Sequence, residues 1–95
     1  MAGYVIADID VTDPVAYQGY AKLTPEIIAK YGGKFLVRGG EAEGVEGTWT
    51  PNRLVVLEFE SLEQAKKFYD SDEYRPVKAI RHKTAVSNMV IGEGA

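Results

Sequence analysis

Glu58 and Arg38 are the first candidates for chemistry, because each is a charged residue in an apolar, strand-like run. Glu58 lies in the run 53–60 (RLVVLEFE), and Arg38 ends the run 34–38 (KFLVR). The planar fork of an arginine can hold a carboxylate or enolate oxygen, while a glutamate among apolar side chains can accept a proton. The same two residues can instead form a structural ion pair, since buried charges are usually paired. We therefore expect Arg38 and Glu58 to be partners in either role.

Further candidates, Tyr69, Tyr74, Arg81 and His82, belong to the second helical region. Phenol and guanidinium groups can polarise a carbonyl, which makes Tyr69 a third candidate catalytic residue. Tyrosines at helical spacing also pack in protein cores, and packing is the alternative role for them. His82 is the only histidine and cysteine is absent, so we expect no transition-metal site.

Two helical regions that must position these residues are marked by start and stop signals. Thr12-Asp13-Pro14 predicts the start of a first helix, and Gly32-Gly33 predicts its end. Pro25 lies inside this helix and predicts a kink or a break. Ser61-Leu62-Glu63-Gln64 predicts a capping box, in which the serine and the glutamine each satisfy a free amide. A second helical piece is expected over 71–82.

Alternating apolar residues predict four strands, over 4–10, 34–38, 53–60 and 84–91. Together with the helical regions, the order of elements is β-α-β-β-α-β. With right-handed crossovers, this order predicts an α+β ferredoxin-like fold, a four-stranded antiparallel sheet in the order 4-1-3-2 with both helical layers on one face. We expect residues 1–95 to form one domain of this kind.

The two helical layers can cover only one face of the sheet, which leaves the other face open. On the helix side we expect Val5, Ala7, Ile9, Phe35, Val37, Val55, Leu57 and Phe59. On the open face we expect Tyr4, Ile6, Leu36, Leu54 and Val56, together with Asp8, Arg38 and Glu58. An open apolar face marks an association surface, so we expect a homodimer with the two sheets face to face. The charged residues would then line a small-molecule site between the sheets.

The connection over 39–52 is rich in glycine and acidic residues and is long enough to be functional. Gly39-Gly40 predicts a turn or bulge whose backbone can approach a ligand. Trp49 is either a lid over the pocket or an anchor at the rim of the dimer. We expect the connection to act as a mobile flap.

Composition excludes several classes of partner. The formal net charge of −3 argues against nucleic-acid binding, which needs a basic surface. No apolar run approaches membrane-spanning length, and the first residues do not form a signal peptide, so we expect a cytoplasmic protein.

The runs GGKFLVRGGE and TWTPNRLVVLEFESLEQAKKFYDSDEYRPVKAIR resemble the family catalogued as domain of unknown function 1330, of the dimeric α/β-barrel superfamily. The resemblance covers nearly the whole chain. It implies candidate ligand-binding roles for the family's recurrent residues, here Arg38, Gly39, Trp49, Arg53, Tyr74 and Arg81 beside Glu58 and Tyr69. Pro76 is less usual in that family, and we expect the last helical piece to bend or restart there.

Two functions follow as expectations. The first is a small enzyme without a bound cofactor, similar to the monooxygenases, isomerases and decarboxylases of the barrel superfamily, acting on an anionic or enolisable compound. The second is a non-catalytic module that binds a small molecule and keeps Arg38 and Glu58 as a structural pair. Fold alone does not separate the two.

Overall fold

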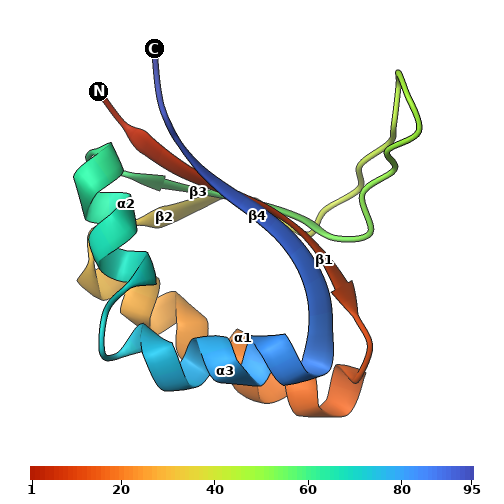
Figure 1. Cartoon of the computed structure of the whole chain (residues 1–95), viewed down its shortest axis with the longest axis horizontal. Coiled ribbons are helices and arrows are strands. Elements are labelled where there is room, and N and C mark those ends of the chain that lie inside the picture. Colours follow the sequence, from red (N-terminus) through yellow and green to blue (C-terminus); the bar gives the residue numbers. More distant parts are fainter.

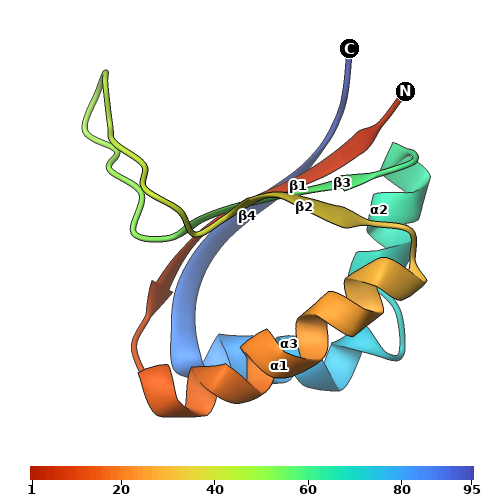
Figure 2. The same ribbon diagram turned by 180° about the vertical axis from the view of Figure 1, so that it is seen from behind.

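The computed structural model describes residues 1–95, which form one antiparallel sheet with helices against one face (Figures 1 and 2). The elements are β1 (Gly3–Val11), α1 (Pro14–Lys30), β2 (Lys34–Arg38), β3 (Leu54–Phe59), α2 (Leu62–Tyr69), α3 (Tyr74–Thr84) and β4 (Ala85–Glu93). The strands lie in the order β2-β3-β1-β4, and each neighbouring pair is antiparallel. The predicted ferredoxin-like α+β fold and its strand order are confirmed.

The helix α1 begins where the sequence predicts, and Pro25 does not break it. The Asp13 side chain accepts a hydrogen bond from Ala16 N at 3.2 Å and so caps the first turn. Pro25 has no N–H to donate to the preceding turn, yet the helix continues to Lys30. Its buried side faces the sheet and consists of Tyr17, Tyr20, Thr24 and Ile28. Of the two expected alternatives at Pro25, a kink or a break, the break is wrong, because this packing outweighs one lost backbone bond.

The second helical region consists of two helices, and half of the predicted capping box is absent. Ser61 Oγ accepts a hydrogen bond from Gln64 N at 3.0 Å, as predicted. The Gln64 side chain donates instead to Tyr31 O at 2.9 Å, which ties α2 to the end of α1. The helix α3 begins at Tyr74, so Pro76 lies within its first turn, where a missing N–H is tolerated.

A β-bulge in β2 reverses the side on which Arg38 lies. Before the bulge Phe35 pairs with Leu57, and after it Arg38 pairs with Val55. Leu36 is the extra residue between them, and one extra residue shifts the alternation of a strand by one position. Arg38 consequently lies on the helix side of the sheet. Its expected place on the open face is wrong.

The same bulge moves Val37 in the opposite direction. Val37 pairs with Val56, which faces away from the helices, so the expected place of Val37 on the helix side is also wrong. Val37 extends an apolar row that crosses all four strands, because Val90 pairs with Ile6 and Ile6 pairs with Val56. We call these four residues the outer stripe. Ile6 is 37% and Val90 60% exposed.

The core lies between the sheet and the helices and is rich in aromatic rings. Phe68 of α2 stacks on Phe59 of β3 with ring centres 5.1 Å apart, and it lies 4.4 Å from the ring of Tyr74. The sheet contributes buried aliphatic side chains from its helix side, namely Val5, Ala7, Ile9 and Leu57. This close-packed layer of rings and aliphatic residues holds the polar residues described below in fixed positions.

The β2–β3 connection and both chain ends project on the side of the sheet opposite the helices (Figures 1 and 2). The two ends lie together, since Gly94 N donates a hydrogen bond to Ala2 O at 2.7 Å. None of the helices combines the length and apolar content needed to cross a lipid bilayer.

Candidate functional site

A cavity lies between the sheet and the helices, on the helix side rather than between two sheets. Its volume, counted as the space open to the centre of a water molecule, is about 50 Å³. Most of its lining is hydrophobic, with residues from β1, β2, β3, β4, α1, α2 and α3. The polar lining consists of Tyr17, Tyr20, Thr24, Arg38, Arg53 and Tyr74.

Arg38 reaches this cavity because of the bulge. Its guanidinium lies over the ring of Phe35, 4.3 Å from the ring centre. A cation on an aromatic face is weakly stabilised, but its hydrogen-bond donors remain free. Arg38 takes part in none of the chain's ion pairs. The expected Arg38–Glu58 pair is therefore wrong.

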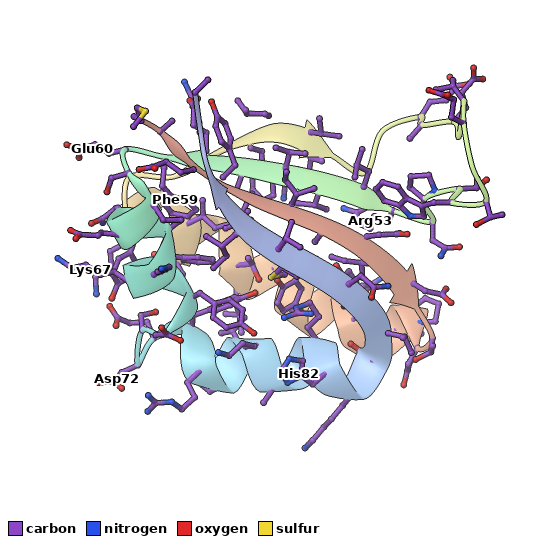
Figure 3. All side chains as sticks on the ribbon, turned by 45° about the horizontal axis from the view of Figure 1, so that its top comes forward. Arg53, Phe59, Glu60, Lys67, Asp72 and His82 are labelled. Atoms are coloured by element: carbon purple, nitrogen blue, oxygen red, sulfur yellow. The ribbon has the colours of Figure 1, made fainter.

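Arg53 also lines the cavity, near the end of β2, and lies immediately before β3 (Figure 3). Its guanidinium rests against Gly39, where a side-chain Cβ would collide with it. Gly39 also has a φ of +72°, a conformation that favours glycine. The Arg53 Nε is buried and has no hydrogen-bond partner. Arg38 and Arg53 together give this end of the cavity two guanidinium groups and no carboxylate.

Asp8 fixes the backbone that carries Arg53, a role that the sequence analysis missed. Its Oδ1 accepts hydrogen bonds from Asn52 N at 2.9 Å and from Arg53 N at 3.3 Å, and its Oδ2 accepts one from Trp49 Nε1 at 2.8 Å. The bond from Trp49 is the main reason why the pKa of Asp8 is lowered. An acidic residue in an apolar strand was the only signal in the sequence, and it is not specific.

Tyr20 and Tyr74 form a hydroxyl pair on the α3 side of the cavity. Their oxygens are 2.6 Å apart, and both residues are buried. Burial raises the pKa of both hydroxyls, and the nearby charge of Arg81 opposes this shift. Burial likewise raises the pKa of Tyr17, the third tyrosine of the lining. The three phenols are therefore neutral hydrogen-bond donors at neutral pH. The sequence analysis assigned no binding role to Tyr17 and Tyr20, because helical spacing does not distinguish a binding role from packing.

Arg81 lies behind this pair. It is 3% exposed, its Cζ is 5.9 Å from the ring centre of Tyr20, and its Nη1 donates to Ser87 Oγ at 2.8 Å. Its Nε is buried without a partner. The predicted site residues Tyr74 and Arg81 thus lie together, with Arg81 behind the cavity lining, and Arg38, Gly39 and Arg53 form a second group.

Glu58 is not part of this arrangement. It lies on the outer face, where its Oε1 is 3.2 Å from Lys34 Nζ and its Oε2 accepts a hydrogen bond from the Tyr4 hydroxyl at 3.0 Å. The bonds from Lys34 and Tyr4 lower the pKa of Glu58. A carboxylate with a lowered pKa on the far side of the sheet cannot act as a base in the cavity.

Tyr69, Trp49 and His82 also lie outside the cavity lining. Lys78 Nζ is 3.8 Å from the ring centre of Tyr69, which packs against the edge of the core. Trp49 is 57% exposed and bonded to Asp8, and His82 is exposed on α3. No group of three histidine, cysteine, aspartate or glutamate residues is placed to hold a metal ion.

The sequence profile of the family described as "Domain of unknown function (DUF1330)" matches residues 2–95. The chain belongs to this family. No functionally curated protein matches the sequence of this DUF1330 protein. The family resemblance expected from the sequence is confirmed.

Solved structures with the same fold are distant in sequence from the DUF1330 chain. A protein of unknown function from Rhodopseudomonas palustris has a TM-score of 0.78 at 15% identity, over 99% of this chain and 82% of that one. A dimeric protein of unknown function and ferredoxin-like fold from Bacteroides fragilis has a TM-score of 0.64 at 16% identity, over 98% of this chain and 96% of that one. The cofactor-independent oxygenase SnoaB from Streptomyces nogalater has a TM-score of 0.63 at 11% identity, over 99% of this chain and 92% of that one. These similarities establish the fold.

Proposed function

We propose that the protein binds a small organic carboxylate in the cavity between its sheet and its helices. The observation that carries the proposal is the pair of guanidinium groups, Arg38 and Arg53, at one end of a mostly apolar cavity with no acidic partner. A binding site of this kind needs an apolar body and a few polar groups that fix the orientation of the ligand.

The charge and shape of the cavity restrict the ligand. Guanidinium forks match a carboxylate, and the buried, unpartnered Nε of Arg53 leaves a donor that an anion can satisfy. The rings of Phe35, Tyr17 and Tyr20 offer flat faces to a planar molecule. The limited space favours a ligand of one ring or a short chain. Benzoate has this size and charge and serves as the probe.

Titration with benzoate by isothermal calorimetry tests the proposal. We expect wild-type protein to bind benzoate, and Arg53→Gln to weaken binding about tenfold to a hundredfold, because a hydrogen bond to a charged group is lost. Arg75→Gln is the matched control, since Arg75 pairs with Asp72 on the surface and does not line the cavity. Failure of the wild type to bind benzoate, or equal losses in the two variants, would contradict the proposed site.

A cofactor-free enzyme acting on an enolisable anion is the second candidate, and similarity to the fold of SnoaB favours it. The arginines would stabilise the negative charge of an enolate. Binding is better supported, because the cavity lining contains neither a carboxylate nor an imidazole to accept the proton. Incubation with acetoacetate in deuterium oxide distinguishes the binding function from the enzymatic one. If the protein is an enzyme, the exchange of the methylene hydrogens of acetoacetate for deuterium, followed by nuclear magnetic resonance, must be faster with wild type than with Arg53→Gln.

We also propose that two copies associate through the outer stripe. The support is apolar surface on all four strands that the helices do not cover, and burying each large side chain of it contributes roughly 1.5 to 3 kcal/mol. The dimeric protein of the same fold from Bacteroides fragilis agrees with such an assembly.

A further inference from the structure

The α3 side of the cavity contains a buried positive charge without a counter-charge. Arg81 is 3% exposed, and no ion pair includes it. One of its nitrogens donates to Ser87, while its Nε has no partner. Burying a guanidinium is costly unless an anion or several acceptors satisfy it. The position of Arg81 therefore indicates that negative charge belongs close by.

The tyrosine pair in front of Arg81 has a hydrogen-bond donor to spare. Tyr20 and Tyr74 line the cavity, and Arg81 does not. Each phenol carries one hydroxyl hydrogen, and the two residues share one hydrogen bond of 2.6 Å. When Tyr20 donates, the hydroxyl hydrogen of Tyr74 has no acceptor among the hydrogen bonds of the protein. This hydrogen is available to an oxygen atom of a ligand in the cavity.

We infer that the Tyr20–Tyr74 pair, with Arg81 behind it, is an oxyanion subsite, and that the ligand is a carboxylate bearing a second, phenolic or enolic oxygen. The inference rests on the proposed function, in which Arg38 and Arg53 hold the carboxylate. The second oxygen accepts the spare hydroxyl hydrogen, and any negative charge on it faces the guanidinium of Arg81. Hydroxybenzoates are the simplest single-ring members of this class.

The subsite has a consequence for the ionisation of a bound phenol. Donors and positive charge that favour the charged form of a group lower its pKa, whereas burial alone raises it. A phenol placed against the tyrosine pair and Arg81 should therefore ionise at a lower pH than the same phenol in water. A merely apolar pocket would shift the pKa of the phenol upward.

Benzoate, 3-hydroxybenzoate and 4-hydroxybenzoate are the probes for this subsite. In calorimetry near pH 7, we expect at least one hydroxybenzoate to bind about tenfold more tightly than benzoate, the effect of one hydrogen bond to the subsite. In absorbance titrations, the phenolate band of that isomer should appear at lower pH when it is bound than when it is free. The use of both isomers allows for either direction of the hydroxyl group relative to the carboxylate.

The double variant Tyr20→Phe with Tyr74→Phe removes the subsite while it keeps the shape of the cavity. Replacing both partners leaves no unsatisfied hydroxyl, so the fold is disturbed less than by either single change. We expect the double variant to lose the preference for hydroxybenzoate over benzoate, measured as the ratio of the two dissociation constants. Tyr69→Phe is the matched control, because Tyr69 lies in the same region but outside the cavity lining, and it should behave as wild type.

The outcomes separate the two proposals. If wild type binds benzoate but gains nothing from either hydroxyl position, or the phenolate band moves to higher pH, the oxyanion subsite is overturned and the carboxylate site stands. If wild type does not bind benzoate at all, the carboxylate site is overturned, and the subsite with it. If the double variant does not fold, the phenolate band of wild type tests the subsite alone. A shift of the band to lower pH supports the subsite, and a shift to higher pH overturns it.

Discussion

Arg38, Arg53 and Arg81 have no carboxylate beside them, unlike the cations of the three ion pairs, which are Lys30, Lys34 and Arg75. The three ion pairs of the protein use other residues and lie on exposed surface, where such pairs contribute little to stability. Unpaired guanidinium groups around a cavity with low polarity create a positive potential there, which attracts an anion. The charges of these single residues, rather than any one motif, therefore indicate that an anion would bind on the helix side of the sheet.

Glu58→Gln tests whether Glu58 has any part in binding. We expect benzoate affinity to stay within about twofold of wild type, because distant sites act nearly independently. Calorimetry of wild type, Glu58→Gln and Arg53→Gln makes the comparison. A large loss of affinity in Glu58→Gln would place the ligand on the outer face and contradict the cavity site.

The same variant has a pH-dependent effect on stability. Hydrogen bonds from Lys34 and Tyr4 lower the pKa of Glu58 in the folded protein. A lowered folded pKa stabilises the protein above the unfolded pKa of a glutamate, about 4.3, and the stabilisation is lost as the pH falls through the folded value. Wild type should therefore be more resistant to urea than Glu58→Gln at pH 7, and the difference should shrink toward pH 3. A difference that grows on acidification would contradict this.

The bulge in β2 shows how much of the fold and of the candidate site can be predicted from the sequence. Alternation correctly predicts the four strands, the capping signals predict where α1 and α2 begin, and connectivity predicts the sheet order. Alternation assumes that no residue is inserted, so it fails after Leu36, and Arg38 and Val37 are assigned to the wrong faces. The sequence predicts a turn or bulge at Gly39-Gly40, but nothing in it marks the extra residue at Leu36, because that bulge depends on how β2 fits against β3. The candidate site was therefore predicted by residue type but not by position.

Gly39→Ala tests how the end of β2 shapes the site. The φ of +72° is strained for alanine, so we expect a loss of about 1 kcal/mol in the free energy of unfolding. The new methyl group would also displace the Arg53 guanidinium and weaken benzoate binding. Gly40→Ala is the matched control, because its Cβ meets no atom within 4 Å. Urea unfolding and calorimetry should distinguish the two variants, and equal behaviour would contradict the packing of Arg53 on Gly39.

The whole molecule has two differently used faces. The helix side contains the core and the cavity, while the outer stripe faces solvent in a single copy. An apolar stripe on an uncovered sheet favours association, because excluding water from each apolar side chain lowers the free energy of the protein. Ligand binding and self-association are therefore expected to be separable properties of this protein.

Val56→Asp tests the association. A charge in the centre of the outer stripe opposes contact between two sheets, so we expect wild type to sediment as a dimer at micromolar concentration and Val56→Asp as a monomer. Val15→Asp is the control, because Val15 is 80% exposed on α1 and away from the stripe. Circular dichroism must show that the variants remain folded. A monomeric wild type would contradict the proposed dimer.

The hydrogen bond between Gly94 and Ala2 has a practical consequence for any experiment that uses a tagged protein. It holds the two chain ends together on the outer side of the sheet, on the side that the second copy would approach. A purification tag or fluorescent fusion at either end would stand beside the association surface and obstruct it. A label meant to leave assembly undisturbed belongs on the opposite side of the protein, for example at the exposed residue Ala79 of α3.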